Sequence, residues 1–245
     1  MEDRTFEFEE ENKKLTIKQN LDIGYAGQVW DASLVLIYFF KKQNSLFKAL
    51  INNKNYTSPK DPNFINDSKK VIFVPKNKII LELGAATGIN GFSCGILGAK
   101  KIYLTDKGGC CKMLETNYEL NKNQFEKEFE CIVQELDWTD EKQRELIKDK
   151  DKIDYIIGSD LVWNPKLREP LANTIKYYMA LNKNIKCFFS FEIRNNEILQ
   201  FFNLFDKSKY KLEKIPDYLY DDTYKSDEII IVRITNSIYF FMFFK

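Results

Sequence analysis

The stretch ILELGAATGINGF, residues 80–92, joins an apolar run holding one carboxylate to a loop of small residues and then to a helical pattern. This order is typical of a strand that passes into a helix around a nucleotide-like ligand. Gly84 and Gly88 frame a turn in which backbone amides can approach a ligand closely. The dinucleotide fingerprint G-x-G-x-x-G would need a glycine where Ala86 stands. The stretch predicts a small-molecule site; a glycine-rich turn without a ligand is the alternative.

From residue 78 onward, short apolar runs alternate with helical patterns. The expected strands are 79–83, 101–106, 129–136, 154–160, 186–192, 210–215 and 228–234. The expected helices between them are 89–98, 109–121, 140–150, 165–181 and 195–205. The central runs are apolar on both faces, as are the strands of a parallel sheet that is covered on both sides. The pattern predicts an α/β fold with a doubly wound, mostly parallel seven-stranded sheet and an antiparallel C-terminal hairpin.

The chain divides into four segments. Residues 1–43 form an N-terminal segment with a helix over 30–42, and residues 44–77 form a lysine/asparagine-rich insertion. We expect this insertion to be loop-like, with at most a short helix or strand of its own. Residues 78–235 form the core, and residues 236–245 form a hydrophobic tail. The tail is too short to span a bilayer, which takes roughly 20 apolar residues.

Composition excludes several classes of chemistry. The chain has no histidine, which removes Ser-His-Asp and Cys-His hydrolases and histidine metal sites. Its five cysteines are odd in number and show no C-x-x-C spacing, so we expect neither a disulfide framework nor a metal site. These features favour a reducing compartment. The acidic N-terminus excludes a secretory signal peptide.

Charge is balanced overall but segregated locally. Residues 2–11 hold six acids against one arginine, and residues 41–78 hold nine lysines against two aspartates. The formal net charge of +1 gives no reason to expect a general nucleic-acid binder. We expect both runs to be solvated surface; docking of an acidic partner on the lysines is the alternative.

Asp106 ends the second expected strand, 22 residues after Gly84. A carboxylate at this place can accept hydrogen bonds from both hydroxyls of a ribose. Nicotinamide and S-adenosylmethionine enzymes share this feature, so it does not separate them. The alternative reading of Asp106 is a helix cap.

Further segments resemble one family. These are GQVWDASLVL (27–36), the Asp-Trp pair at 137–138, GSDLVWNP (158–165), FEIR (191–194) and DDTYKSDEIIIVRI (221–234). With the 82–88 loop, they are similar to the seven-strand (class I, Rossmann-like) protein-lysine methyltransferases. The resemblance is greatest to the group that includes the lysine methyltransferase of valosin-containing protein. One departure concerns the D-x-x-Y motif of the family, where Trp163 replaces the tyrosine.

The resemblance implies S-adenosylmethionine as cofactor, S-adenosylhomocysteine as product, and no metal. It places the cofactor-binding residues at Trp30, Glu82, Gly84, Ala85, Ala86, Gly88, Asp106, Trp138 and Ser159. Asp106 would hold the ribose, Trp138 the adenine and Trp30 the methionine end. Asp160 and Trp163 are the candidate catalytic residues, at the mouth where a substrate lysine enters.

A lysine side chain has a free pKa near 10.4 and must lose a proton before it can accept a methyl group. Burial and a neighbouring positive charge would lower that pKa. The carboxylate of Asp160 attracts the ammonium but also favours its protonated form. We therefore expect Asp160 to position the lysine while water takes the proton. Trp163 would offer a cation–π face worth about 0.5–2 kcal/mol.

The sequence thus predicts a monomeric, cytoplasmic protein-lysine methyltransferase, with the nucleus as a further location. The expected partner is a protein substrate, with valosin-containing protein the first candidate; neither a membrane nor a nucleic acid is expected. Three alternatives stay open. The basic run favours a nucleic-acid or other small-substrate methyltransferase. Ala86 and Trp163 favour a catalytically silent cofactor-binding module. The third alternative is a nicotinamide dehydrogenase, but this sequence shows no evident catalytic tyrosine–lysine pair.

Overall fold

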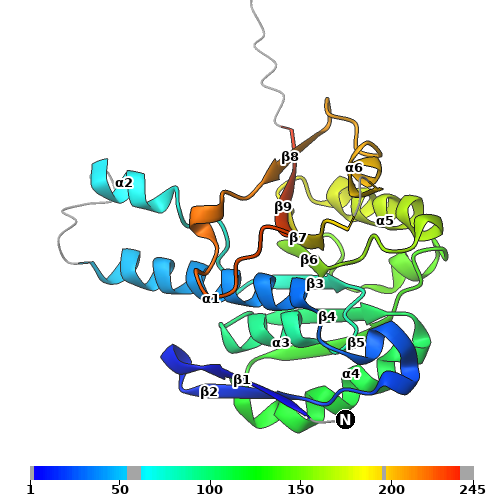
Figure 1. Cartoon of the computed structure of the whole chain (residues 1–245), viewed down its shortest axis with the longest axis horizontal. Helices are drawn as coiled ribbons and strands as arrows, with labels where there is room; N and C mark the ends of the chain where they lie inside the picture. Colours follow the sequence, from blue (N-terminus) through cyan, green and yellow to red (C-terminus); the bar gives the residue numbers. More distant parts are fainter. Residues whose placement is uncertain (1–2, 54–61, 195–196, 238–245) are drawn as a thin grey trace, which may run out of the picture.

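A computed structural model describes residues 3–53, 62–194 and 197–237. Seven strands form one sheet in the order β5-β4-β3-β6-β7-β9-β8 (Figure 1). Their bounds are β5 Glu130–Glu135, β4 Lys101–Asp106, β3 Ile79–Leu83, β6 Tyr155–Ser159, β7 Lys186–Glu192, β9 Ile229–Asn236 and β8 Tyr210–Lys214. The first five pair in parallel, and β9 pairs antiparallel with both β7 and β8. The predicted doubly wound sheet and its C-terminal hairpin are confirmed.

Helices cover both faces of the sheet. On one face lie α1 (Asp31–Asn52), α3 (Ile89–Ile96) and α4 (Gly108–Asn121); on the other lie α5 (Arg168–Leu181) and α6 (Glu197–Phe202). Neighbouring residues of one strand enter different cores, since side chains alternate across a strand. Ile80 packs under α1 and α3, whereas Leu81 packs under α5. This double coverage explains why the strands are apolar on both faces.

The described parts of the lysine/asparagine-rich insertion are more ordered than expected. Helix α1 continues nine residues into it and ends at Asn52, and α2 spans Pro62–Ser68. The returning chain is tied to α1 because the side-chain oxygen of Gln43 accepts hydrogen bonds from the amides of Ile72 and Phe73. The ring of Phe73 stacks on that of Phe40 with centroids 4.2 Å apart. The end of the insertion therefore packs against α1 through buried contacts.

The prediction of a helix over 140–150 is wrong. Only a short 3-10 turn, η4 (Gln143–Leu146), forms there. The carboxylate of Asp137 accepts a hydrogen bond from the amide of Thr139, and that of Asp140 accepts one from the amide of Lys142. Aspartates that bond to the backbone two residues later favour turns over helices.

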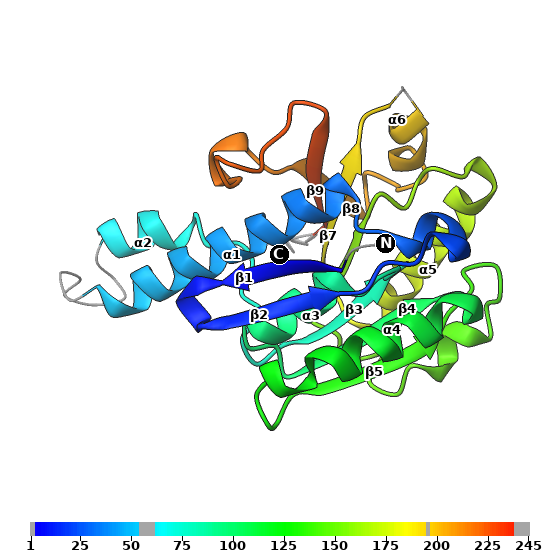
Figure 2. The ribbon, with the colours of Figure 1, turned by 60° about the horizontal axis from the view of Figure 1, so that its bottom comes forward.

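An N-terminal hairpin of β1 (Arg4–Phe8) and β2 (Lys13–Ile17) lies along α1, α3 and α4 (Figure 2). The acidic residues at its tip pair with lysines of α1, although Glu9 and Glu10 remain exposed as expected. Lys41 of α1 pairs with Glu9 at 3.0 Å, and Lys48 pairs with Glu11 at 2.6 Å and with Glu10 at 3.3 Å. The segregated charges therefore meet within the chain.

Within the three described ranges, no single helix is long and apolar enough to cross a membrane. The last eight residues of the hydrophobic tail predicted over 236–245 lie outside the described residues.

Candidate active site

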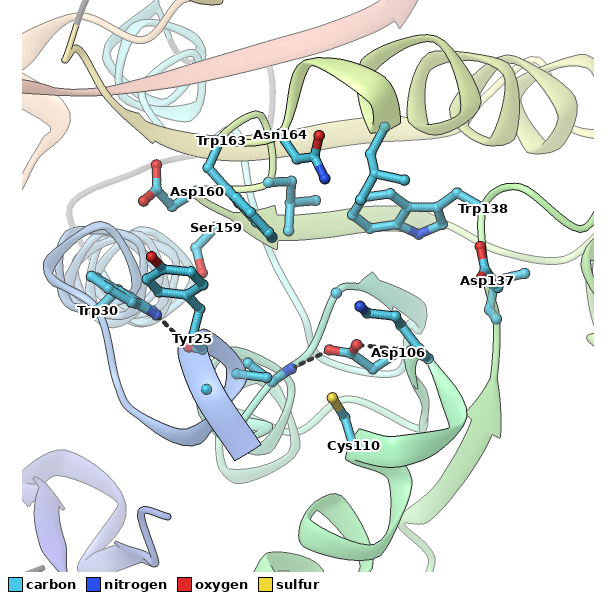
Figure 3. A pocket seen from close by; sticks show the side chains of 18 of the residues that line it. Tyr25, Trp30, Asp106, Cys110, Asp137, Trp138, Ser159, Asp160, Trp163 and Asn164 are labelled. Carbon is cyan, nitrogen blue, oxygen red and sulfur yellow. Dashed lines mark hydrogen bonds between the residues drawn. The ribbon is translucent and has the colours of Figure 1, made fainter. Parts of the chain in front are cut away.

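A cavity of about 710 Å³ opens at the carboxyl ends of β3, β4 and β6 (Figure 3). Its wall is assembled from six parts of the chain. These are the 3-10 helix η2 (Leu21–Gly27) with Trp30, the loop after β3, the β4–α4 junction, residues 136–139 after β5, the segment after β6, and Arg194 after β7. Ligands of doubly wound sheets bind at this edge. The position matches the one expected from the opening loop.

The loop after β3 follows a path that demands small residues. Gly84, Ala86 and Gly88 all have positive φ angles, of 59°, 52° and 84°. A β-carbon on Gly84 would lie 2.7 Å from a methyl carbon of Leu161 and 3.2 Å from the ring of Trp138. Any side chain there would therefore displace the cavity wall. Ala86 carries its methyl group in a left-handed conformation that costs roughly 1–2 kcal/mol.

Asp106 connects this loop to the end of β4. Its two carboxylate oxygens accept hydrogen bonds from the amides of Ala86 and Lys107, both at 2.8 Å. Burial raises the pKa of Asp106, and the two amides oppose that rise. Burial also raises the pKa of the neighbouring Cys110 thiol to about 12, so that this side chain stays neutral. A carboxylate fixed in this way presents its remaining lone pairs to the cavity.

The wall facing Asp106 fits an adenosyl group. The indole nitrogen of Trp138 is buried, yet it has no hydrogen-bond partner among the described residues. An unsatisfied buried donor costs roughly 1–3 kcal/mol, so this atom calls for an acceptor from a ligand. The Trp138 ring and the Asp106 carboxylate line the same cavity (Figure 3). An aromatic base with ring nitrogens and a sugar with adjacent hydroxyls would satisfy both.

Glu82 lies below the cavity rather than in its wall. Its carboxylate accepts hydrogen bonds from the amide of Gly91 at 2.8 Å and from the side chain of Asn90 at 3.1 Å. The same Asn90 nitrogen lies 3.1 Å from the hydroxyl of Ser159, which lies 2.7 Å from that of Ser33. This series of contacts joins α1, α3, β3 and β6 beneath the loop after β3.

The free energy of unfolding should depend on pH because Glu82 is buried. Burial raises its pKa from 4.5 to about 8, so the folded state favours the protonated carboxyl. The stability that the protonated Glu82 contributes to the folded state is complete below pH 4.5, declines as the pH rises, and is lost above about pH 8. In Glu82→Gln the decline between pH 5 and 8 should shrink by roughly 2–3 kcal/mol. Urea unfolding at several pH values measures it; parallel curves for both proteins would contradict the prediction.

Asp160 lines the cavity on the segment after β6. This residue has a left-handed φ of 53°, and its amide donates to the carbonyl of Ser190 at 2.8 Å. Its carboxylate lies 2.7 Å from the guanidinium of Arg194, which also pairs with Glu192. Burial opposes the charge of Arg194, but Asp160 and Glu192 outweigh it and raise the pKa of the arginine. The sequence analysis did not anticipate this partner for Asp160.

Eight of the eleven predicted site residues line the cavity. They are Trp30, Gly84, Ala86, Asp106, Trp138, Ser159, Asp160 and Trp163. The other three, Glu82, Ala85 and Gly88, do not line the cavity, and their part in cofactor binding stays a prediction. Ala85 and Gly88 shape the loop through backbone hydrogen bonds. Glu82 supports it from below.

Tyr25 and Arg194 are wall residues that the sequence analysis did not name as site residues. Tyr25 contacts the rings of both Trp30 and Trp163, and its carbonyl accepts a 2.8 Å hydrogen bond from the indole of Trp30. No sequence signal singles it out except its place just before the 27–36 segment. Arg194 stands in the FEIR segment, at the end of the strand next to β6, and that position could have suggested its contact with Asp160.

Comparison with known proteins identifies several relatives. A family model described as "Lysine methyltransferase" matches residues 9–208. Methyltransferase-like protein 23 of Dictyostelium discoideum is 25% identical, over 91% of this chain and 83% of that protein. EEF1A lysine methyltransferase 3 of Xenopus tropicalis is also 25% identical, over 91% of this chain and 80% of that protein.

Other matches cover less. Protein-lysine N-methyltransferase EFM3 of Saccharomyces cerevisiae is 31% identical, but over only 51% of this chain and 36% of its own length. A solved structure of a predicted O-methyltransferase from Agrobacterium tumefaciens superposes with a TM-score of 0.50 at 16% identity, over 69% of this chain and 78% of that one. At such low identity the superposition supports the fold alone.

Proposed function

The chain belongs to the lysine methyltransferase family, and from this premise we propose how its cavity holds S-adenosylmethionine and a substrate lysine. The protein is an S-adenosylmethionine-dependent protein-lysine methyltransferase. One observation carries the proposed site: the amide-bound carboxylate of Asp106 and the unpartnered indole nitrogen of Trp138 lie in one cavity wall. An adenosyl group offers partners to both.

We propose the following assignment of the cofactor site. Asp106 accepts the ribose hydroxyls, and Trp138 contacts the adenine. Gly84 and Ala86 leave room for the backbone to approach the ligand, and Trp30 borders its methionine end. When bound, S-adenosylmethionine supplies a methyl group on a positively charged sulfur, and the sulfur keeps the electron pair of the broken bond. No cluster of three metal-ligating side chains occurs within the part of the chain that the structure describes.

The residues of the chain position the lysine. A channel that excludes water lowers the pKa of the substrate ammonium. The positive sulfur of the cofactor and the guanidinium of Arg194, which lies beside Asp160, would lower it further. Asp160 orients the amine while its own charge is partly offset by Arg194. This pairing weakens the tendency of Asp160 to keep the lysine protonated, so water can take the proton. Trp163 lines the approach.

Asp160→Asn should lower the turnover number about tenfold to a hundredfold and leave the affinity for the cofactor product near normal. Asparagine tolerates a left-handed backbone as aspartate does, so the variant removes the charge without new strain. Initial rates of labelled methyl transfer and calorimetry with S-adenosylhomocysteine measure the two quantities. A variant with unchanged turnover would remove Asp160 from the mechanism.

Two proteins are the first substrates to try. The name of the Xenopus relative points to EEF1A, and the sequence motifs resemble the group that acts on valosin-containing protein. We propose to incubate the enzyme with labelled cofactor and either purified protein or fractionated extract, followed by mass spectrometry of the labelled lysine. A chain that binds S-adenosylhomocysteine but labels no protein would match the silent-module alternative.

The nucleic-acid alternative loses support from the fold. Seven of the nine lysines in residues 41–78 are described, and five of them lie within 4.0 Å of a carboxylate. Those charges are already engaged within the chain, which leaves fewer cations for a phosphate backbone. Labelling of RNA or DNA in place of protein would reverse this conclusion.

We also propose a monomer located in the cytoplasm, with the nucleus as a further location. All five cysteines are free thiols, which suits a reducing compartment. Light scattering of the purified protein tests the first point, and fractionation of cells tests the second.

A further inference from the structure

Two exposed aromatic rings from distant parts of the chain meet at the cavity. Tyr25 comes from η2 and Trp163 from the segment after β6, and their side chains are 66% and 52% exposed. Their ring centroids lie 5.3 Å apart at an angle of 49° (Figure 3). Both residues line the cavity. At this spacing the two rings contact each other, so together they form one aromatic surface that a side chain in the cavity would contact.

The position of Tyr25 is built into the local backbone. The indole N–H of Trp30 donates a 2.8 Å hydrogen bond to the backbone carbonyl of Tyr25, and the centroids of the two rings lie 6.1 Å apart. The preceding Gly24 has φ 75° and ψ −145°, a conformation that side chains disfavour. A β-carbon on Gly24 would meet nothing within 4 Å, so the glycine serves the backbone conformation rather than packing. This conformation directs Tyr25 to the cavity.

Each carboxylate of the same wall already has at least one partner. Asp106 accepts two backbone amides, and Asp160 is paired with Arg194 at 2.7 Å. Asp137 accepts the amide and the hydroxyl of Thr139 at 2.9 and 2.7 Å. An ammonium near Asp160 would therefore share that carboxylate with Arg194, and its other N–H groups would face aromatic carbon.

Aromatic faces attract a cation but offer N–H groups no strong acceptor. Each methyl group on an ammonium replaces one N–H and makes the cation easier to dehydrate, and aromatic cages bind such methylated cations. We propose that Tyr25 and Trp163 form an aromatic slot that binds methylated lysine more tightly than unmodified lysine. The enzyme would then continue beyond the first methyl. This inference rests on the proposed function.

Each round of the reaction is balanced by the same chemistry. One N–C bond forms as one S–C bond breaks, the sulfur keeps the electron pair, and the nitrogen releases one proton to water. The aromatic slot acts on binding alone. It retains the partly methylated lysine, which then accepts the next methyl from a fresh cofactor molecule.

Calorimetry on the full chain saturated with S-adenosylhomocysteine tests the slot. Two peptides, acetyl-Gly-Lys-Gly amide and its Nε-trimethyllysine analogue, differ only in the methyl groups. The trimethylated peptide should bind about threefold to tenfold more tightly. Tyr25→Ala should abolish that preference, whereas Tyr25→Phe, which keeps the ring, should retain it. Tyr218→Ala is a matched control, since Tyr218 is 68% exposed but lies outside the cavity wall.

The other outcomes each decide the matter. Equal affinities, no heat from either peptide, or a preference that survives in Tyr25→Ala would overturn the slot while the cofactor site stands. Loss of the preference in Tyr25→Phe would overturn it as well, because the hydroxyl and not the ring would then be responsible. If S-adenosylhomocysteine itself fails to bind, the proposed cofactor site fails first and the slot falls with it. In the extract assay, Tyr25→Ala should shift labelled lysine from trimethyl toward monomethyl product.

Discussion

Asp106→Asn should weaken the binding of S-adenosylhomocysteine by about 2–3 kcal/mol, roughly a hundredfold. The carboxylate accepts the amides of Ala86 and Lys107 while it faces the cavity. An asparagine has only one acceptor oxygen, so its NH2 group must face either a backbone N–H or the ribose. Each charge-assisted hydrogen bond lost in a buried site costs about 1.5–3 kcal/mol. Isothermal calorimetry measures the difference directly.

Asp137→Asn provides the control in the same wall. One oxygen of Asp137 accepts both hydrogen bonds from Thr139, and an asparagine retains that oxygen. We expect its affinity for S-adenosylhomocysteine to stay within a few-fold of the wild-type value. If Asp106→Asn also changed the affinity less than threefold, Asp106 would not hold the ribose.

Gly91→Ala should lower the free energy of unfolding by about 2–3 kcal/mol, the usual cost of forcing atoms into a packed core. Gly91 lies in α3 where the helix meets the sheet. A β-carbon there would lie 2.3 Å from a methyl carbon of Leu104 and 2.7 Å from the carboxylate of Glu82. Both neighbours are fully buried, so neither can move without displacing others. The melting temperature should fall by roughly 4–12 °C.

Gly109→Ala is the opposite case on the next helix, α4. A β-carbon at Gly109 meets nothing within 4 Å, and its backbone has no positive φ. Alanine reduces the freedom of the unfolded chain, so this variant should be stabilised by up to about 0.5–1 kcal/mol. Scanning calorimetry of both variants compares them. Equal melting temperatures for the pair would show that the contact at Gly91 is not tight.

The sheet was predictable from sequence because strands covered on both faces need apolar residues at nearly every position. The N-terminal hairpin was not anticipated, although Phe6 and Phe8, and Leu15 and Ile17, alternate with polar residues and are buried. The run of acids between them dominated the pattern. That run is paired with lysines of α1, a contact across more than 30 residues that no local pattern contains.

The candidate site was predictable to the extent that its residues stand in contiguous motifs. The 82–88 loop, Asp106 and the 158–165 segment lie next to strands whose order follows from the fold class. Contacts between segments were not predictable in this way. Asp160 had the features of a free carboxylate in sequence, but Arg194, 34 residues later, neutralises part of its charge. Tyr25 belongs to no motif, and only folding brings it to Trp163.

The chain has three tryptophans, Trp30, Trp138 and Trp163, and all three line the one cavity. Indole emission from this protein therefore originates at the cavity that we propose to hold the cofactor. Fluorescence excited at the indole band needs no dye or label to follow ligand entry. Stopped-flow records of that emission would give rate constants for cofactor arrival and product departure from the unmodified chain.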